Sequence, residues 1–188
     1  NGESIENFDT AVKITATTNA TNITVRNLTI RNAADEGVRT VTGSSNSTRN
    51  LTISNVTMED VDTGFYVPSS SESTPRVEFA IRNSSINATT TGVDVFKNDV
   101  GRYGVELEDN FINTTNGDNG VGFSLTENGT DLNLSMVNNT VTSAESGVSL
   151  NLERSHAITD LELRENEINV SGDLNDRAID LDNSDSVD

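Results

Sequence analysis

Ile23-Thr24-Val25-Arg26-Asn27-Leu28-Thr29-Ile30 is the stretch of sequence that decides the fold of this chain. Its pattern reads apolar-x-apolar-x-Asn-x-x-apolar. The pattern returns five times at intervals of 26 to 29 residues, with Asp or Glu in place of the asparagine in two copies. A fixed period of this length is typical of a repeat architecture. The six copies begin at Ile23, Leu51, Phe79, Val105, Leu134 and Leu161.

A shorter block, with a small residue followed by apolar-x-apolar, comes after each copy of the first. Each apolar-x-apolar unit predicts a short strand with one buried face, because successive side chains of a strand point to opposite sides. Two such strands per repeat of about 27 residues predict a coil that winds once per repeat and stacks its strands in parallel. The copies begin at Ala11, Gly37, Gly64, Gly92, Gly120, Gly147 and Ala178.

We therefore predict an all-β fold, a right-handed parallel β-helix of about seven coils, as one domain over residues 1–188. A leucine-rich repeat fits worse, because no asparagine-anchored helix follows each strand, and a β-sandwich would show less regular spacing. The repeats resemble those of pectate-lyase-like parallel β-helix proteins, which implies a carbohydrate-active or cell-surface role. Because the block at Ala11 has no first block before it, we expect a piece of a longer protein.

The chain is strongly acidic and poor in lysine. It has 30 Asp and Glu against 12 Lys and Arg, a net charge of -18, and only Lys13 and Lys97 as lysines. Such a composition resembles that of proteins from salt-loving archaea, in which hydrated carboxylates maintain solubility in high salt; an ordinary acidic secreted protein is the alternative. We expect no nucleic-acid binding, because no basic patch meets phosphates, and no membrane-spanning segment, because no apolar run is long enough. Absence of cysteine excludes disulfides.

An acidic column lies two residues before the small residue of each second block. Six of its seven positions are Asp or Glu. Asp-x-Gly is a common turn in which the carboxylate bonds nearby backbone. Alternatively, carboxylates stacked one coil apart suit a hard cation such as Ca²⁺, the only cofactor that the sequence suggests. The candidate calcium ligands are Asp35, Asp62, Asp118 and Glu145.

The outward positions of the first block are where the resemblance places the sites of β-helix polysaccharide lyases. Arg82 lies one coil from Glu106 and Glu108, and a lyase needs a base near neutralised carboxylates. The same three residues also suit an ion-pair patch on a solvated strand face. The clustered aspartates of such lyases are missing, and the only histidine, His156, lies in a turn. We expect no catalytic site, with these three residues as the only candidates.

Asn-x-Ser/Thr sequons for N-glycosylation occur 13 times. We expect the asparagines of the repeated first block, Asn27, Asn55, Asn83 and Asn138, to be too enclosed for modification. A glycan is bulky, so adjacent coils cannot all be occupied. The better candidates lie beside loops or just after a strand: Asn46, Asn50, Asn87, Asn113, Asn128, Asn133 and Asn169.

These features favour a non-catalytic extracellular segment with a structural or adhesive role in a surface protein, a filament, or a viral spike or fibre. One alternative is a carbohydrate-active enzyme, either a polysaccharide lyase or a glycoside hydrolase. Another is a carbohydrate-binding module that uses an outward sheet face. The expected partners are further copies of the chain or surface glycans.

Overall fold

The computed structural model describes residues 3–16, 21–42, 48–68, 76–97, 102–116, 119–125, 131–153, 157–172 and 176–184. In these ranges every regular element is a strand, and no helix is long and apolar enough to cross a membrane. The strands are β1 (Glu3–Glu6), β2 (Thr10–Ala16), β3 (Thr21–Arg31), β4 (Glu36–Thr42), β5 (Thr48–Val67), β6 (Arg76–Arg82), β7 (Ser85–Lys97), β8 (Arg102–Glu108), β9 (Phe111–Thr114), β10 (Asn119–Leu125), β11 (Asp131–Val137), β12 (Thr140–Ser143), β13 (Ser146–Glu153), β14 (Ala157–Arg164), β15 (Glu167–Val170) and β16 (Arg177–Ser184).

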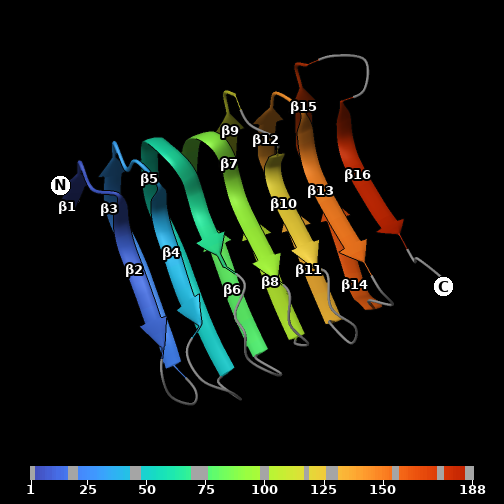
Figure 1. Cartoon of the computed structure of the whole chain (residues 1–188), viewed down its shortest axis with the longest axis horizontal. Coiled ribbons are helices and arrows are strands. Elements are labelled where there is room, and N and C mark those ends of the chain that lie inside the picture. Colours follow the sequence, from blue (N-terminus) through green and yellow to red (C-terminus); the bar gives the residue numbers. More distant parts are fainter. Residues whose placement is uncertain are drawn as a thin grey trace.

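The strands wind into a solenoid with the two chain ends at its opposite ends (Figure 1). All strand pairings in the described ranges are parallel. The first sheet contains the N-terminal parts of β3 and β5 together with β6, β8, β11 and β14. The second sheet contains β2, β4, the C-terminal parts of β5 and β7, and β10, β13 and β16. Short strands β1, β9, β12 and β15 belong to a third, narrow sheet between them.

The parallel β-helix is confirmed, but its coil count differs from the prediction. Five turns have a hydrogen-bonded neighbour on both sides, rather than the seven equivalent coils that the repeats predicted. A partial coil of β1 and β2 lies at one end, and a coil of β14, β15 and β16 lies at the other, each pairing on one side among the described residues. The repeat pattern cannot distinguish these end coils from inner ones. The inner turns are 21–42, 48–67, 76–97, 102–125 and 131–153.

The repeated asparagine column makes the corner where each coil leaves the first sheet. All six of its residues have φ between 50° and 57°, in the left-handed region that asparagine and aspartate tolerate better than most residues. The side chains also stack, since Asn138 Nδ2 donates to Asp109 Oδ1 at 2.6 Å. The prediction that the sequon asparagines of this column are enclosed is wrong: all four are exposed. The column consists of Asn27, Asn55, Asn83, Asp109, Asn138 and Glu165.

The small residues of the second block are required by the close approach of neighbouring coils. A Cβ on Gly64 would lie 2.4 Å from the main-chain oxygen of Gly92 and 2.4 Å from Ile86 Cγ2. Gly92 and Gly120 meet the next coil in the same way. Each of the five inner coils therefore turns from the third sheet into the second sheet at a glycine that has no room for a side chain, whereas the end coils have Ala11 and Ala178 at this position.

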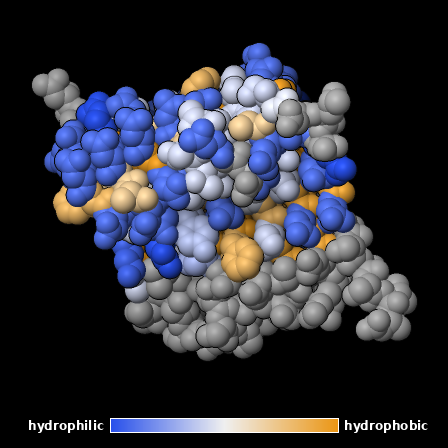
Figure 2. Space-filling model, turned by 45° about the horizontal axis from the view of Figure 1, so that its top comes forward, coloured by the Kyte–Doolittle hydropathy of each residue, from blue (hydrophilic) through white to orange (hydrophobic). Residues whose placement is uncertain are grey.

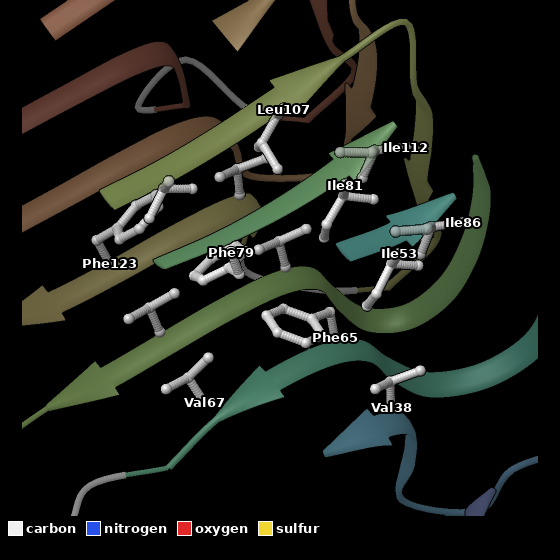
Figure 3. Packing of buried hydrophobic residues seen from close by; sticks show 14 of the residues in the cluster. Val38, Ile53, Phe65, Val67, Phe79, Ile81, Ile86, Leu107, Ile112 and Phe123 are labelled. Atoms are coloured by element: carbon white, nitrogen blue, oxygen red, sulfur yellow. The ribbon is translucent and has the colours of Figure 1, made fainter. Parts of the chain in front are cut away.

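The core is a narrow column of apolar side chains enclosed by the three sheets (Figure 3). Ile53, Ile81 and Leu107 stack from successive coils of the first sheet, and none has exposed surface. Phe65 of the second sheet packs against Phe79 of the first, with ring centroids 4.8 Å apart. Because each coil contributes only a few inward residues, 32% hydrophobic residues are enough to fill this core.

Thr40 interrupts the core with a buried hydroxyl group. It is 5% exposed, borders a cavity of about 20 Å³, and its Oγ1 has no hydrogen-bond partner among the described residues. We predict that Thr40→Val raises the free energy of unfolding by about 1–2 kcal/mol, because valine keeps the shape and removes an unpaired buried polar group. Urea denaturation checks this, with the exposed Thr24→Val as the control. A loss of stability in Thr40→Val would contradict the absence of a partner.

Candidate functional site

The outer face of the first sheet carries three rows of side chains that cross the coils. Alternate residues of each strand point outward, and the parallel register aligns them with their equivalents on the next coil. The first row is Asn22, Asn50, Glu78, Gly104, Asn133 and Asp160. The second row is Thr24, Thr52, Ala80, Glu106, Ser135 and Glu162. The third row is Arg26, Ser54, Arg82, Glu108, Val137 and Arg164.

A groove of about 370 Å³ lies on this face, mainly over the first two rows. It coincides with Gly104, which has no side chain, and Ala80, which has only a methyl group. Glu78, Arg82 and Glu106 also line the groove. The remaining polar lining combines amide, hydroxyl and carboxylate groups, which can both donate and accept hydrogen bonds. These residues are Asn50, Thr52, Asn133, Ser135 and Asp160.

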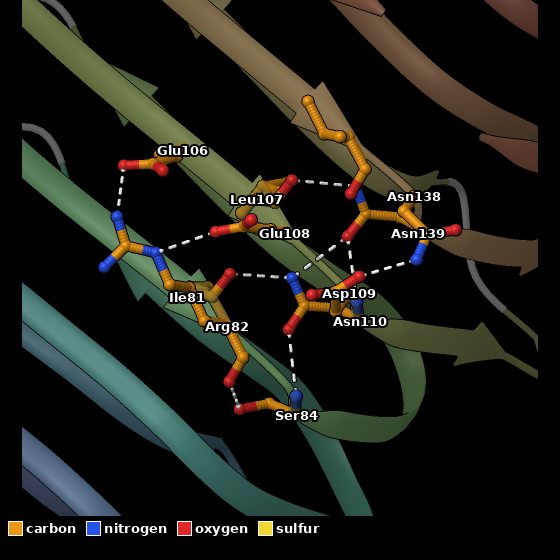
Figure 4. A network of polar contacts seen from close by, with 11 residues as sticks. Ile81, Arg82, Ser84, Glu106, Leu107, Glu108, Asp109, Asn110, Asn138 and Asn139 are labelled. Carbon is orange, nitrogen blue, oxygen red and sulfur yellow. Dashed lines mark hydrogen bonds and ion pairs between the residues drawn. The ribbon is translucent and has the colours of Figure 1, made fainter. Parts of the chain in front are cut away.

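The structure brings the three candidate catalytic residues together (Figure 4), and two of them, Arg82 and Glu106, line the groove. Arg82 Nη2 lies 2.6 Å from Glu106 Oε2, and Arg82 Nε lies 3.2 Å from Glu108 Oε2. The hydrogen bond to Glu106 is the largest of the causes that raise the pKa of the Arg82 guanidinium. This group is therefore held as a cation, and the arrangement corresponds to the ion-pair patch that was one interpretation of the sequence.

A buried polar ladder, which sequence reasoning missed, runs beside the corner column. Its residues, called here the inner ladder, each follow a left-handed corner residue by one position: Ser84, Asn110, Asn139 and Asn166. Asn110 is 3% exposed and Asn139 is 1% exposed. The recurring doublets Asp109-Asn110, Asn138-Asn139 and Glu165-Asn166 are the signal that could have revealed it.

Asn110 and Asn139 each link three coils, whereas Asn166 bonds to the preceding coil (Figure 4). Asn139 Oδ1 accepts hydrogen bonds from the main-chain N–H and from Nδ2 of Asn110, both at 3.0 Å. Asn139 Nδ2 donates to the main-chain oxygen of Leu107 at 2.8 Å and to Asn166 Oδ1 at 2.9 Å. These bonds satisfy main-chain groups at a corner where the strand pairing is interrupted, so the ladder fixes the position of the groove sheet from one coil to the next.

The acidic column lies at another corner, where each coil passes from the third sheet to the second, and part of it lines a second hollow of about 250 Å³. Asp35 and Asp62 line it together with Asp94. Thr90 Oγ1 donates to Asp62 Oδ1 at 2.5 Å, and Thr63 N–H donates to the main-chain oxygen of Asp35 at 2.8 Å. Both contacts link neighbouring coils at this corner.

The calcium site stays a prediction. Within the ranges that the structure describes, no three His, Cys, Asp or Glu side chains gather closely enough to hold a metal ion. Glu145 is exposed at a turn, where its main-chain oxygen accepts from Arg177 N–H at 3.2 Å. Asp118, the fourth candidate ligand, and the single histidine, His156, lie outside the described residues.

The candidate glycosylation sites differ in the freedom of their side chains. Four are exposed, and Asn113 is half-buried and donates to Asn87 Oδ1 at 2.8 Å. Asn169 Nδ2 donates to Glu167 Oε1 at 3.1 Å. Asn46 and Asn128 lie outside the described residues. The four exposed sites are Asn50, Asn87, Asn133 and Asn169.

Comparison with known proteins gives no significant match to a protein-family model, to a curated protein or to a solved structure. The function of the chain must therefore be inferred from the geometry and charge of its own surfaces.

Asp94, in the second hollow, predicts a dependence of stability on pH. Burial raises its pKa from 3.8 to about 6, so the folded chain favours the neutral acid. The stability that this group contributes is complete below pH 4 and is lost as the pH rises through about 6. The free energy of unfolding of the original chain should therefore fall between pH 4.5 and pH 7.5. We predict that this fall is about 1–2 kcal/mol smaller in Asp94→Asn.

Urea denaturation at the two pH values measures this difference. The control is Asp160→Asn, which removes one negative charge from an exposed position. An equal effect of the two substitutions would show that overall charge, rather than the burial of Asp94, causes the pH dependence.

Proposed function

We propose that this chain is a non-catalytic extracellular segment with a structural or adhesive role in a surface protein, a filament, or a viral spike or fibre. In this proposal the solenoid is a rigid rod, and the outer face of its first sheet is the contact surface. Further copies of the chain or surface glycans are the proposed partners. The finer resemblance to pectate-lyase-like proteins belongs to the same proposal, as a shared architecture without the lyase reaction.

The state of Arg82 is the observation that carries the non-catalytic part of the proposal. A lyase base must lose its proton to act. Arg82 instead lies between the carboxylates of Glu106 and Glu108, and its pKa is raised by these contacts. Because both carboxylates favour the protonated guanidinium, this group is poorly suited to abstract a proton from a sugar ring.

The surface composition supports a location in a salty extracellular medium. Figure 2 shows hydrophilic side chains over much of the coloured face, with apolar residues between them. Arg31 lies between two carboxylates of neighbouring coils. Its Nη1 is 3.4 Å from Glu6 Oε1, and its Nε is 2.6 Å from Glu59 Oε2. With 30 acidic residues and 12 basic ones, acidic charges exceed basic charges by 18. Dissolved cations would reduce the repulsion among the carboxylates.

A carbohydrate-binding module is the second candidate function, and the groove is the observation that favours it. The lining groups, such as the Asn133 amide and the Thr52 hydroxyl, are of the kinds that exchange hydrogen bonds with sugar hydroxyls. Among the described lining residues the one aromatic side chain, that of Phe79, is 3% exposed and belongs to the core. Any sugar contact would therefore depend on hydrogen bonds rather than on ring stacking.

We predict that the chain does not cleave acidic polysaccharides. The test monitors the ultraviolet absorbance of unsaturated uronates in high salt, with and without Ca²⁺. The expected trace is flat for both the unmodified chain and Arg82→Ala. Rising absorbance that Arg82→Ala abolishes would contradict the proposal and indicate a lyase site on the first sheet. Binding of the polysaccharide without cleavage, measured by calorimetry, would favour the carbohydrate-binding module.

A further inference from the structure

Two N-glycosylation sequons lie with both of their essential residues in the groove. Residues i and i+2 of a strand share one face, so Asn50 and Thr52 point outward together, as do Asn133 and Ser135. All four residues line the groove. A glycan on either asparagine would therefore begin inside the groove rather than on a loop.

The two asparagines differ in the space and freedom around them. Asn50 Nδ2 donates to Asn22 Oδ1 at 3.0 Å, and Glu78 is its neighbour on the following coil. Asn133 is exposed, and its side chain has no hydrogen bond to any residue that the structure describes. Its neighbours in the same row are Gly104, which has no side chain, and the exposed Asp160 on the other side. Asn133 is thus the acceptor with an unoccupied amide and open space beside it.

We propose that Asn133 is N-glycosylated and that its glycan lies in the groove over Gly104, so that the glycosylated chain presents a closed groove. The inference rests on the proposed extracellular location, because N-glycosylation requires passage through a secretory route. It goes further in assigning one acceptor and in placing its glycan.

The modification is a group transfer from a lipid-phosphate-linked oligosaccharide. A bond forms between Asn133 Nδ2 and the anomeric carbon of the first sugar. The bond between that carbon and the phosphate oxygen breaks, and the lipid phosphate leaves with the electron pair. The amide nitrogen loses one proton to a base of the transferase. Asn133-Leu134-Ser135 supplies the acceptor amide and the hydroxyl that the sequon requires.

The groove suits the attached sugars in its chemistry. The carboxylates of Glu78 and Glu106 can accept hydrogen bonds from sugar hydroxyls, and the Thr52 hydroxyl can donate or accept. In the part of the groove lining that the structure describes there are three carboxylates, at Glu78, Glu106 and Asp160, and one guanidinium, that of Arg82. This excess of negative charge favours a neutral glycan over an acidic one.

The test combines glycopeptide mapping with a cysteine reporter, which the absence of native cysteine makes possible. Protein from its native cells is mapped for occupancy at each sequon. Gly104→Cys is then produced in the same cells, alone and together with Asn133→Gln or Ser135→Ala, which both destroy the sequon. Ser149→Cys, on the outer face of the second sheet, is the matched reporter. Reaction of each thiol with a maleimide reports the access to its position.

We expect a glycan on Asn133 and maleimide labelling of Gly104→Cys that is at least about fivefold slower than in either sequon variant. Labelling of Ser149→Cys is expected to be the same in all backgrounds. Occupied sequons elsewhere with a bare Asn133, or equal labelling of Gly104→Cys in all backgrounds, would overturn the inference and leave the proposed function standing. A mass equal to that of the bare chain would overturn the extracellular location itself, and the inference with it.

Discussion

Gly92→Val is expected to lower the free energy of unfolding by about 3 kcal/mol or more, or to prevent folding. A Cβ at this position would lie 2.2 Å from Ile112 Cγ2 and 2.5 Å from the main-chain oxygen of Gly120. The backbone oxygen cannot move without shifting the next coil. Neighbouring glycines make equivalent contacts. A backbone shift that relieved the clash at Gly92 would therefore create a clash at the glycine corner of the next coil.

The matched control is Gly104→Ala on the outer face of the first sheet. Its added Cβ would lie 3.3 Å from Cγ of Glu78, a flexible side chain, so we expect a change of less than about 1 kcal/mol. Urea denaturation followed by circular dichroism compares the two variants. If both lost the same stability, the close approach of coils at the Gly92 corner would not be the cause.

Asn139→Leu is expected to lower the free energy of unfolding by about 3–4 kcal/mol, because it removes the hydrogen bonds at the middle of the inner ladder. The substitution leaves the Asn110 main-chain N–H and the main-chain oxygen of Leu107 without their partners in a buried corner. Asn166 Oδ1 also loses the hydrogen bond from Asn139 Nδ2. Leucine has a similar volume, so the predicted loss reflects missing hydrogen bonds rather than a cavity.

The exposed Asn133→Leu is the control for this substitution, since its amide has no hydrogen bond to the described residues. We expect the free energy of unfolding of Asn133→Leu to stay within about 0.5 kcal/mol of that of the chain without substitutions. Hydrogen exchange of the Asn110 amide gives a second measurement, because this proton should exchange faster in Asn139→Leu. A leucine at position 139 that preserved both stability and exchange would contradict the assigned role of the ladder.

The sequence predicted the parallel β-helix because a solenoid repeats its constraints in every coil. The corner column needs residues that accept positive φ, and Asn27 and its equivalents show this requirement at a regular spacing. The column of Gly64 and Gly92 shows the close approach of coils in the same way. Each constraint is local and recurs at least five times, so the repeat reveals it without knowledge of distant contacts.

Features that occur in only one or a few coils were less predictable. The inner ladder begins only at Ser84, because the equivalent positions of earlier coils hold Leu28 and Val56. The groove forms where two small residues, Gly104 and Ala80, lie near each other on adjacent coils. Their proximity can be recognised only after the register of the strands is known. The contact of Arg82 with Glu106 and Glu108 was predictable from the repeat, but its effect on the pKa of Arg82 required the distances.

The register of neighbouring coils is the central claim, since the groove, the ladders and the core all follow from it. Cysteine pairs test it most directly in a chain without native cysteine. Ser135 and Glu162 are in register on β11 and β14, whereas Ser135 and Asp160 are offset by two residues. Neighbouring strands lie about 4.8 Å apart, within the reach of a disulfide. Mild oxidation should therefore cross-link Ser135→Cys with Glu162→Cys and leave Ser135→Cys with Asp160→Cys as free thiols, whereas the opposite pattern would contradict the proposed register.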